Sequence, residues 1–191
     1  QAAATEIARH ELYGCTGAEM VQEMKPYFTD FPNVKNNCLR FEVSPSIEES
    51  SSFTDADWAE LGNDFMQRMG LMNHQYIIIK HSGTESKKEQ AHLHILANRI
   101  SLSGELYRDN WIGKRATEAA NAIAKERNFV QSQDIGKANK EEIKEVMNSV
   151  LKKMQGFDLT KFQEELGKLG FKVREARAST GKLNGYYVTA R

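Results

Sequence analysis

The sequence predicts an α+β fold, with an antiparallel or mixed central sheet, helices packed on one face of it, and a small C-terminal α/β segment. Three observations favour this class. Apolar residues recur at helical spacing in several segments, two β-branched apolar runs lie in the middle of the chain, and the connections between elements are short. With 191 residues, 40% of them hydrophobic, the chain suits one medium domain, with or without a small appendage.

The first third of the chain predicts a helix, a strand and a second helix. Residues 16–24 begin with Thr16 and place Glu19 three positions later, which is a capping-box pattern. Residues 36–44 alternate apolar and polar side chains and predict a strand, and residues 54–70 predict the second helix. The apolar stripe of this second helix consists of Trp58, Leu61, Phe65, Met66 and Met69.

The middle of the chain predicts two adjacent strands and a helix. The run "HQYIIIKH" at 74–81 and the run "AHLHILANRI" at 91–100 are both apolar and rich in β-branched residues or leucine. A short polar segment at 82–90 joins them, so antiparallel pairing is expected. A turn and a short extended piece follow, and residues 110–129 then predict a helix with alanine on its packing side.

The last third predicts a separate segment. Residues 131–139 have no periodicity and are expected to be a linker between a domain at 1–130 and a C-terminal segment at 140–191. That segment predicts two helices, the second at 158–170, and then a β-hairpin at 171–191. The apolar stripe of its first helix comprises Ile143, Val146, Met147, Val150, Leu151 and Met154.

Composition excludes some classes of protein. No run of about 18 apolar residues exists, so no membrane-spanning helix is expected. Cys15 and Cys38 have neither metal-ligand spacing nor the density of a disulfide framework, which favours a reducing cytoplasm. The chain begins at Gln1 without a basic-then-apolar leader, and we expect the natural start of the protein to lie upstream.

Charge is distributed unevenly along the chain. The net charge is zero, which argues weakly against a general polyanion binder. Residues 1–70 hold 5 Lys/Arg against 12 Asp/Glu, whereas residues 137–191 hold 12 against 7. A nucleic-acid footprint would therefore lie in the second half, although solvated helix faces of varied charge give the same pattern.

Three histidines form the main candidate site. Because strand side chains alternate, His92 and His94 project to the same side, about 6.5 to 7 Å apart, while Leu93 points to the opposite side. Antiparallel pairing would bring His81 close to them. Three imidazoles at this spacing suit one divalent ion. The alternative is a polar sheet face with hydrogen-bonded histidines.

The order of these motifs resembles a known family. "HQYIIIKH", "HLHILANRI", "RDN" and a basic helix ending in "ERNF" follow one another, and "LRFEVSPSIEE" precedes them. Together they resemble the relaxase/mobilisation nucleases, which are HUH endonucleases (His, hydrophobic residue, His) of conjugative or mobilisable elements. The resemblance covers roughly residues 5–130 and implies an HUH-endonuclease-like fold.

The resemblance also implies a reaction. A tyrosine would attack one phosphodiester of single-stranded DNA at an origin of transfer and form a phosphotyrosine, which is later reversed. His81, His92 and His94 match the family's metal ligands, and the ion, Mg or Mn, would polarise the scissile phosphate. The implied partners are relaxosome accessory proteins and the coupling protein of a type IV secretion system, in the bacterial cytoplasm.

Further site residues are carried over by position. Asn98 and Arg99 match the N-R that follows the family's histidine pair. Alternation puts Asn98 on the histidine face and Arg99 on the other, where it is equally a strand-end cation. Gly83 stands where many relatives have an acidic residue, so either Glu85 or Glu89 takes that role or the acid is absent.

The nucleophile is expected outside this sequence. In the family it lies near the N-terminus, before the helix that residues 5–20 resemble, so we expect it upstream of Gln1. Tyr13 is the nearby candidate, and packing in a loop is its alternative role.

Lys114 and Arg115, at the start of a helix, are candidate DNA contacts. Basic residues of the tail either contact phosphates or are solvated: Lys168, Lys172, Arg174, Arg177 and Lys182.

Two other hypotheses remain open from the sequence. The first is a DNA-binding remnant that holds the origin without cutting it, because its tyrosine has been lost. The second is an unrelated metal protein of the cupin type. That fold needs a glutamate a few residues after the H-x-H and another histidine on a later strand, but no histidine follows His94.

Overall fold

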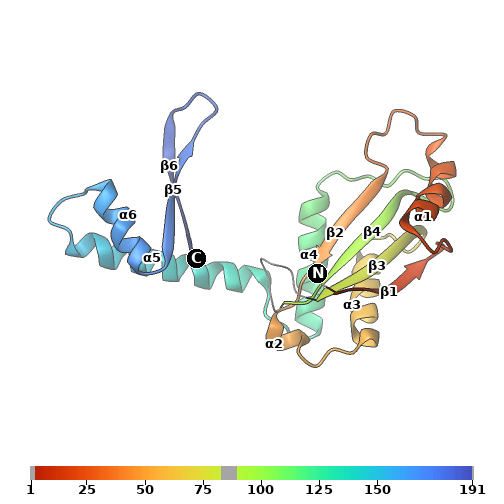
Figure 1. Cartoon of the computed structure of the whole chain (residues 1–191), viewed down its shortest axis with the longest axis horizontal. Coiled ribbons are helices and arrows are strands. Elements are labelled where there is room, and N and C mark those ends of the chain that lie inside the picture. The colour runs from red at the N-terminus through yellow and green to blue at the C-terminus, as the bar shows by residue number, and fades with distance from the viewer. Residues whose placement is uncertain (1–2, 83–89, 191) are drawn as a thin grey trace. The chain divides into compact units, whose positions relative to one another are not determined.

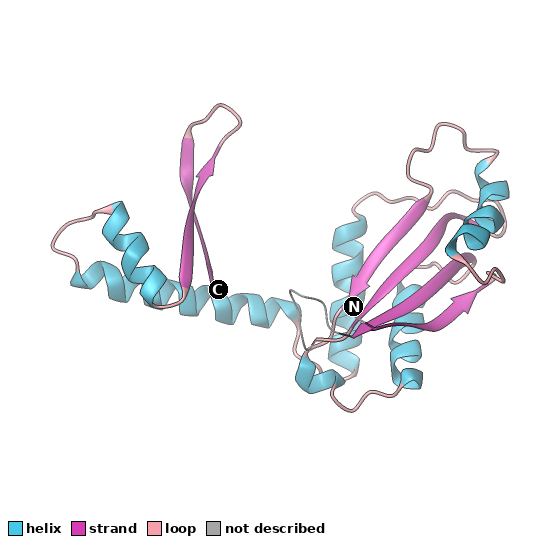
Figure 2. Ribbon diagram, viewed as in Figure 1, coloured by secondary structure: helices cyan, strands magenta, loops and turns pink. Residues whose placement is uncertain are grey.

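The computed structural model describes residues 3–82 and 90–190, which form two compact units, 1–130 and 131–191. The first unit contains a four-stranded antiparallel sheet with helices against it (Figure 1). The second contains two helices and a two-stranded antiparallel sheet (Figure 2). The predicted α+β class is confirmed.

The sheet of the first unit has the strand order β1-β3-β4-β2. Its strands are β1 (Ala3–His10), β2 (Cys38–Val43), β3 (His74–Ser82) and β4 (His92–Ser101), and each pairs antiparallel with its neighbours. The two apolar runs of the sequence are thus the two central strands. Both strands are largely buried, and the burial of β3 decreases from Ile79 to Ser82, at the end that carries His81.

β1 was not predicted from the sequence. The residues that resemble the start of a family helix form this edge strand, and the first helix, α1, spans Gly17–Met24. β1 has Ile7 as its only bulky apolar side chain, and a bulge between Glu6 and Ala8 breaks the alternation of sides. A period-two pattern therefore could not be read from it.

Helices α3 (Asp55–Arg68) and α4 (Ile112–Glu126) cover one face of the sheet (Figure 1). All five members of the predicted α3 stripe are buried against the strands. Gly62 allows this close approach, because an added Cβ would lie 2.7 Å from Ile78 Cδ1 and 3.3 Å from Leu93 Cδ1. The short helix α2 (Ile47–Ser50) lies between β2 and α3 in the chain.

A smaller apolar cluster occupies the opposite face. Ile77, Ile79 and Leu96 point to this side and pack with residues of α1 and of the 3-10 helix η1 (Lys25–Phe28). The sequence predicted helices on one face, which describes α3 and α4, and α1 with η1 adds a partial cover on the second face. The histidine end of that face lies beyond this cluster.

The second unit has its own core. It consists of α5 (Ser132–Lys153), α6 (Leu159–Lys168), β5 (Phe171–Arg177) and β6 (Leu183–Ala190). Five of the six residues in the predicted α5 stripe belong to the core, and Leu151 is the exception. α5 begins at Ser132, so nearly all of the residues expected as a linker are helical. Residues 137–142 are exposed, and a solvated turn leaves no apolar period to detect.

Candidate functional site

Three histidine side chains gather at one end of the β3–β4 pair. His81 lies directly opposite His92 in the register, and His94 lies two residues further along β4 on the same side. The ring centroids are 5.6 Å apart for His81 and His92, 4.4 Å for His81 and His94, and 4.9 Å for His92 and His94. Leu93, between the pair, is fully buried on the helix-covered face. Strand alternation therefore places all three imidazoles on one face of the sheet, where His92 is buried and His81 and His94 are partly buried.

β2 adds an arginine and a glutamate to this surface. Arg40 Nη2 lies 3.3 Å from His94 Nδ1, and Glu42 is the register partner of His94. Neither Arg40 nor Glu42 was predicted as a site residue from the sequence. The alternation in "CLRFEV" contained the signal, because burial of Leu39, Phe41 and Val43 on one face sends Arg40 and Glu42 to the other. Without the strand order, nothing in the sequence placed β2 beside the histidines.

The environment of His94 favours its neutral form. Desolvation is the largest cause that lowers the pKa of His94, and the charges of His81, Arg40 and His92 lower it further. Glu42 acts in the opposite direction and raises the pKa. A neutral imidazole keeps a lone pair on one ring nitrogen, which is the form that binds a metal ion.

Hydrogen bonds indicate the tautomers of two rings. His92 Nδ1 lies 3.3 Å from the Gln90 carbonyl oxygen, which only accepts, so Nδ1 is the donor, and in the corresponding neutral tautomer Nε2 has the lone pair. His94 Nδ1 faces the Arg40 guanidinium, which only donates, so its Nδ1 is the acceptor. His92 is thus oriented as a ligand, whereas His94 becomes one only when Arg40 releases it.

The cluster fits a metal ion in donor type and spacing but not in ring orientation. Imidazole nitrogens about 2.1 Å from one ion place the ring centroids roughly 4.5–5.5 Å apart, close to the observed separations. The rings of His81 and His94, however, stack at 18°. Across residues 3–82 and 90–190, no three His, Cys, Asp or Glu side chains are arranged as a metal site. Ion binding therefore requires the rings to turn.

Asn98 is held inside the protein. It is completely buried, its Nδ2 donates to Gln75 Oε1 at 2.9 Å, and its Oδ1 accepts from the Ile100 backbone N–H at 2.9 Å. It shares the histidine face but lies four residues beyond His94, about 13 Å along the strand. The structure gives Asn98 a role in joining β3 to β4.

Arg99 is used on the opposite face, as alternation predicts. Its Nη2 pairs with Asp109 Oδ1 at 2.7 Å, and its Nε donates to the Tyr107 carbonyl oxygen at 3.1 Å. Its Nη1 also donates to the backbone of Asn36. The guanidinium therefore fixes the segments that follow β4 and precede β2.

Tyr13 lies toward the other end of the sheet. It follows the C-terminal end of β1, where His10 pairs with Tyr76, and Tyr76 is five residues, or about 16 Å, from His81 along β3. The Tyr13 hydroxyl donates to Glu11 Oε2, and this bond raises the pKa of Tyr13, which opposes its use as a nucleophile. The candidate Glu85, together with Gly83 and Glu89, lies outside the described residues.

The two candidate DNA contacts on α4 belong to the helix layer that covers the face opposite the histidines. Arg115 donates to the Arg108 carbonyl oxygen, and its guanidinium lies 4.8 Å from the centre of the Tyr107 ring. Lys114 is exposed, with Glu118 Oε1 at 3.8 Å. The structure does not bring either residue together with the histidines.

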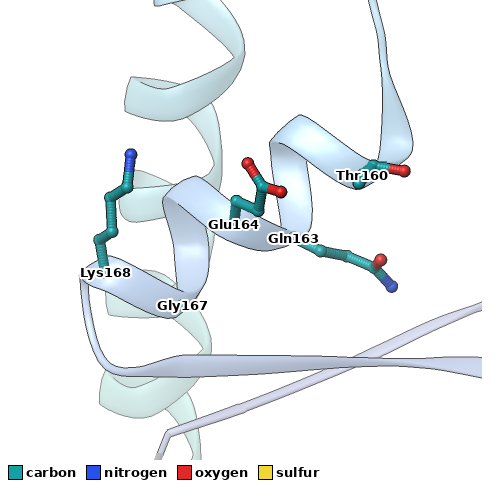
Figure 3. Close-up of a pocket in the computed structure, with 5 residues that line it drawn as sticks. All are labelled: Thr160, Gln163, Glu164, Gly167 and Lys168. Carbon is teal, nitrogen blue, oxygen red and sulfur yellow. The ribbon is translucent and has the colours of Figure 1, made fainter.

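A pocket on α6 has no convergent chemistry. Its lining consists of Thr160, Gln163, Glu164, Gly167 and Lys168. Figure 3 shows that the four side chains drawn diverge instead of meeting at one point. The Lys168 ammonium also donates to Glu165. A binding site needs polar groups that converge, so this pocket is not the candidate site.

A comparison with protein families identifies the first unit. A family model described as "Relaxase: MobA/VirD2-like, nuclease domain" matches residues 1–129. The chain belongs to this relaxase family. The match includes the whole four-stranded sheet and the three histidines, and it ends next to the boundary between the two units.

The other comparisons add no relative. No curated protein and no solved structure matches the chain. The relaxase assignment supports a nuclease that nicks DNA in mobilisation. Among the described helices, none is long and apolar enough to cross a membrane.

Proposed function

We propose that residues 1–130 form a metal-dependent relaxase domain that nicks and rejoins one DNA strand at a specific site in an origin of transfer. The observation that carries the proposal is the cluster of three imidazoles, with ring centroids no more than 5.6 Å apart, beside the Arg40 guanidinium. The family match supports the nuclease activity. The three imidazoles and the guanidinium are groups that can bind a metal ion and a phosphate.

The histidine face would hold both a divalent ion and the scissile phosphate. His81, His92 and His94 are the ligand set, and the ion, Mg or Mn, supplies Lewis-acid polarisation of the phosphorus when bound. Arg40 leaves His94 and donates its N–H groups to a non-bridging phosphate oxygen, where its charge balances the charge that develops during attack. Gln90 holds His92 in the ligand tautomer through its carbonyl oxygen.

The nucleophile in this proposal is a tyrosine that precedes β1 in the full protein. Ala3 pairs with Ser82 and Ala4 with His81, so β1 starts next to the histidines. The tyrosine hydroxyl gives up its proton as its oxygen bonds to phosphorus, the bond from phosphorus to the 3′-oxygen breaks, and the 3′-oxygen takes up a proton, so that no net proton is gained or lost. The reverse transfer rejoins the strand. Tyr13, which follows the far end of β1, is not the group we propose.

The second candidate is a non-cleaving protein that only holds origin DNA. The position of Tyr13 favours it, because the sequence's own candidate nucleophile lies away from the histidines and its hydroxyl is bonded to Glu11. Both candidates bind single-stranded origin DNA, and only the first forms a covalent adduct. Relaxosome proteins, the coupling protein of a type IV secretion system, and a bacterial cytoplasmic location remain proposals for either case.

The test is cleavage by the full protein. A single-stranded oligonucleotide from the element's own origin is incubated with Mg²⁺ or Mn²⁺, with and without chelator, and covalent adducts are separated on a denaturing gel. His92→Ala with His94→Ala should lower cleavage about 100-fold or more. His10→Gln, a change at a histidine outside the cluster, serves as the control and should cleave normally. Wild-type cleavage by the double variant would refute the site, and binding without any adduct would favour the second candidate.

A further inference from the structure

The second unit concentrates its positive charge on one hairpin. Residues 131–170 carry seven basic and seven acidic residues, whereas residues 171–191 carry five basic residues and one acidic residue. The two helices are therefore balanced, and the surplus belongs to the segment that contains β5 and β6. Figure 2 shows the far part of this hairpin projecting beyond α5 and α6.

The hairpin has an inner and an outer face. Phe171, Val173 and Val188 point inward and join the core of the unit. The outer face carries Lys172 and Arg174 on β5, and their register partners on β6 are Thr189 and Tyr187. Lys172, Arg174, Tyr187 and Thr189 are all exposed, and together we call them the outer hairpin face.

Tyr187 is an unusually accessible ring for a strand. Its exposed fraction is 65%, and it lies directly opposite Arg174, with Lys172 diagonal to it. The only acidic residue of the hairpin, Glu175, points to the other face and pairs with Arg177 at 2.7 Å. Neither Lys172 nor Arg174 has an ion-pair partner among residues 3–82 and 90–190. The outer hairpin face thus combines one open aromatic ring with two cations that the described residues do not neutralise.

We propose that the outer hairpin face binds single-stranded DNA. A base stacks on the Tyr187 ring, and Lys172 and Arg174 contact the phosphates on either side of it. Aromatic rings flanked by basic residues on a strand surface bind single strands in this manner, because every base has a stacking face and every linkage a negative charge. An unpaired base is required, since the bases of a duplex are already stacked. The inference extends the proposed function by giving the second unit its own contact with the same DNA strand.

The test measures binding by the full chain without cleavage. Fluorescence anisotropy with a labelled oligothymidine of about 20 nucleotides is recorded in chelator, so that nicking and metal binding play no part. Tyr187→Ala should weaken binding about 5- to 160-fold, whereas Tyr187→Phe, which keeps the stacking ring, should bind nearly as well as wild type. Because the Tyr187 ring is exposed, the alanine variant should fold as the wild type does, and circular dichroism checks this.

A charge pair gives the matched control. Lys172→Ala with Arg174→Ala should weaken binding and reduce the slope of log K against log salt by about 1.4. Lys152→Ala with Lys153→Ala removes the same charge from exposed positions at the end of α5 and should change affinity much less. The inference would be overturned if the two double variants weakened binding equally. It would also be overturned if the variants lost as much affinity for a duplex of the same length as for the single strand. Failure of nicking alone would leave this binding result unchanged, so the two proposals are judged separately.

Discussion

The close approach of α3 to the histidine-bearing strands predicts the effect of one added methyl group. In Gly62→Ala the new Cβ would lie 2.7 Å from Ile78 Cδ1, 3.1 Å from Ile78 Cγ2 and 3.3 Å from Leu93 Cδ1. Both neighbours are fully buried, so they have little room to move. Overpacking of this kind costs typically about 1–3 kcal/mol, and alanine returns about 1 kcal/mol of helix propensity. We expect a net loss of about 1 kcal/mol.

Tryptophan fluorescence can follow this unit by itself, because both tryptophans, Trp58 and Trp111, lie in residues 1–130. For 130 residues, a loss of 1 kcal/mol lowers Tm by about 3–4 °C. Gly113→Ala is the matched control in α4, where an added Cβ meets nothing within 4 Å, and it should be neutral or stabilising. If Gly62→Ala raised Tm as much as Gly113→Ala, the tight contact between α3 and the strands would be refuted.

Three further predictions concern individual side chains. Arg40→Ala should tighten Mn²⁺ binding in calorimetry, since it removes a cation and frees His94 Nδ1, yet should weaken DNA cleavage. Burial lowers the pKa of His74, so the unfolded chain takes up its proton first and stability should fall as pH drops below about 6.5. In urea titrations His74→Gln should lose less stability over that range than wild type, and an unchanged pH dependence would contradict this. Asn98→Ala should destabilise the first unit by about 2–4 kcal/mol in urea, because Gln75 loses a partner inside the core. A stable Asn98→Ala protein with weakened DNA binding would instead support Asn98 as a site residue.

Periodicity predicted the elements with strong apolar patterns. The apolar stripe of α3 follows from a period of 3.6 residues. The two central strands, and the closeness of His81 to the H-x-H pair, follow from a period of two residues and from the short connection between the strands. β1 and the first turns of α5 were not predicted. An alanine-rich, bulged edge strand and a solvated helical turn bury few large side chains, so neither has a pattern to read.

The site was predictable where one strand pair built it and not where a third strand contributed. His92 and His94 share a face by alternation alone, whereas Arg40 and Glu42 reach them only because β2 pairs with β4 across about fifty residues of chain. The position of Asn98 in the family's motif made it a candidate site residue, and in the structure its amide is bonded to Gln75 and to the backbone of Ile100 within the core. Position in a motif does not say whether a side chain is free to meet a ligand.

Titration of Mn²⁺ into the chain is the most direct test of the histidine site. Isothermal calorimetry of wild type should give one ion per chain, with protons released if a ligand is protonated at the working pH. His92→Ala with His94→Ala should abolish that binding, and His10→Gln should preserve it. Equal Mn²⁺ affinity in wild type and in the double variant would contradict the assignment of His81, His92 and His94 as the metal ligands.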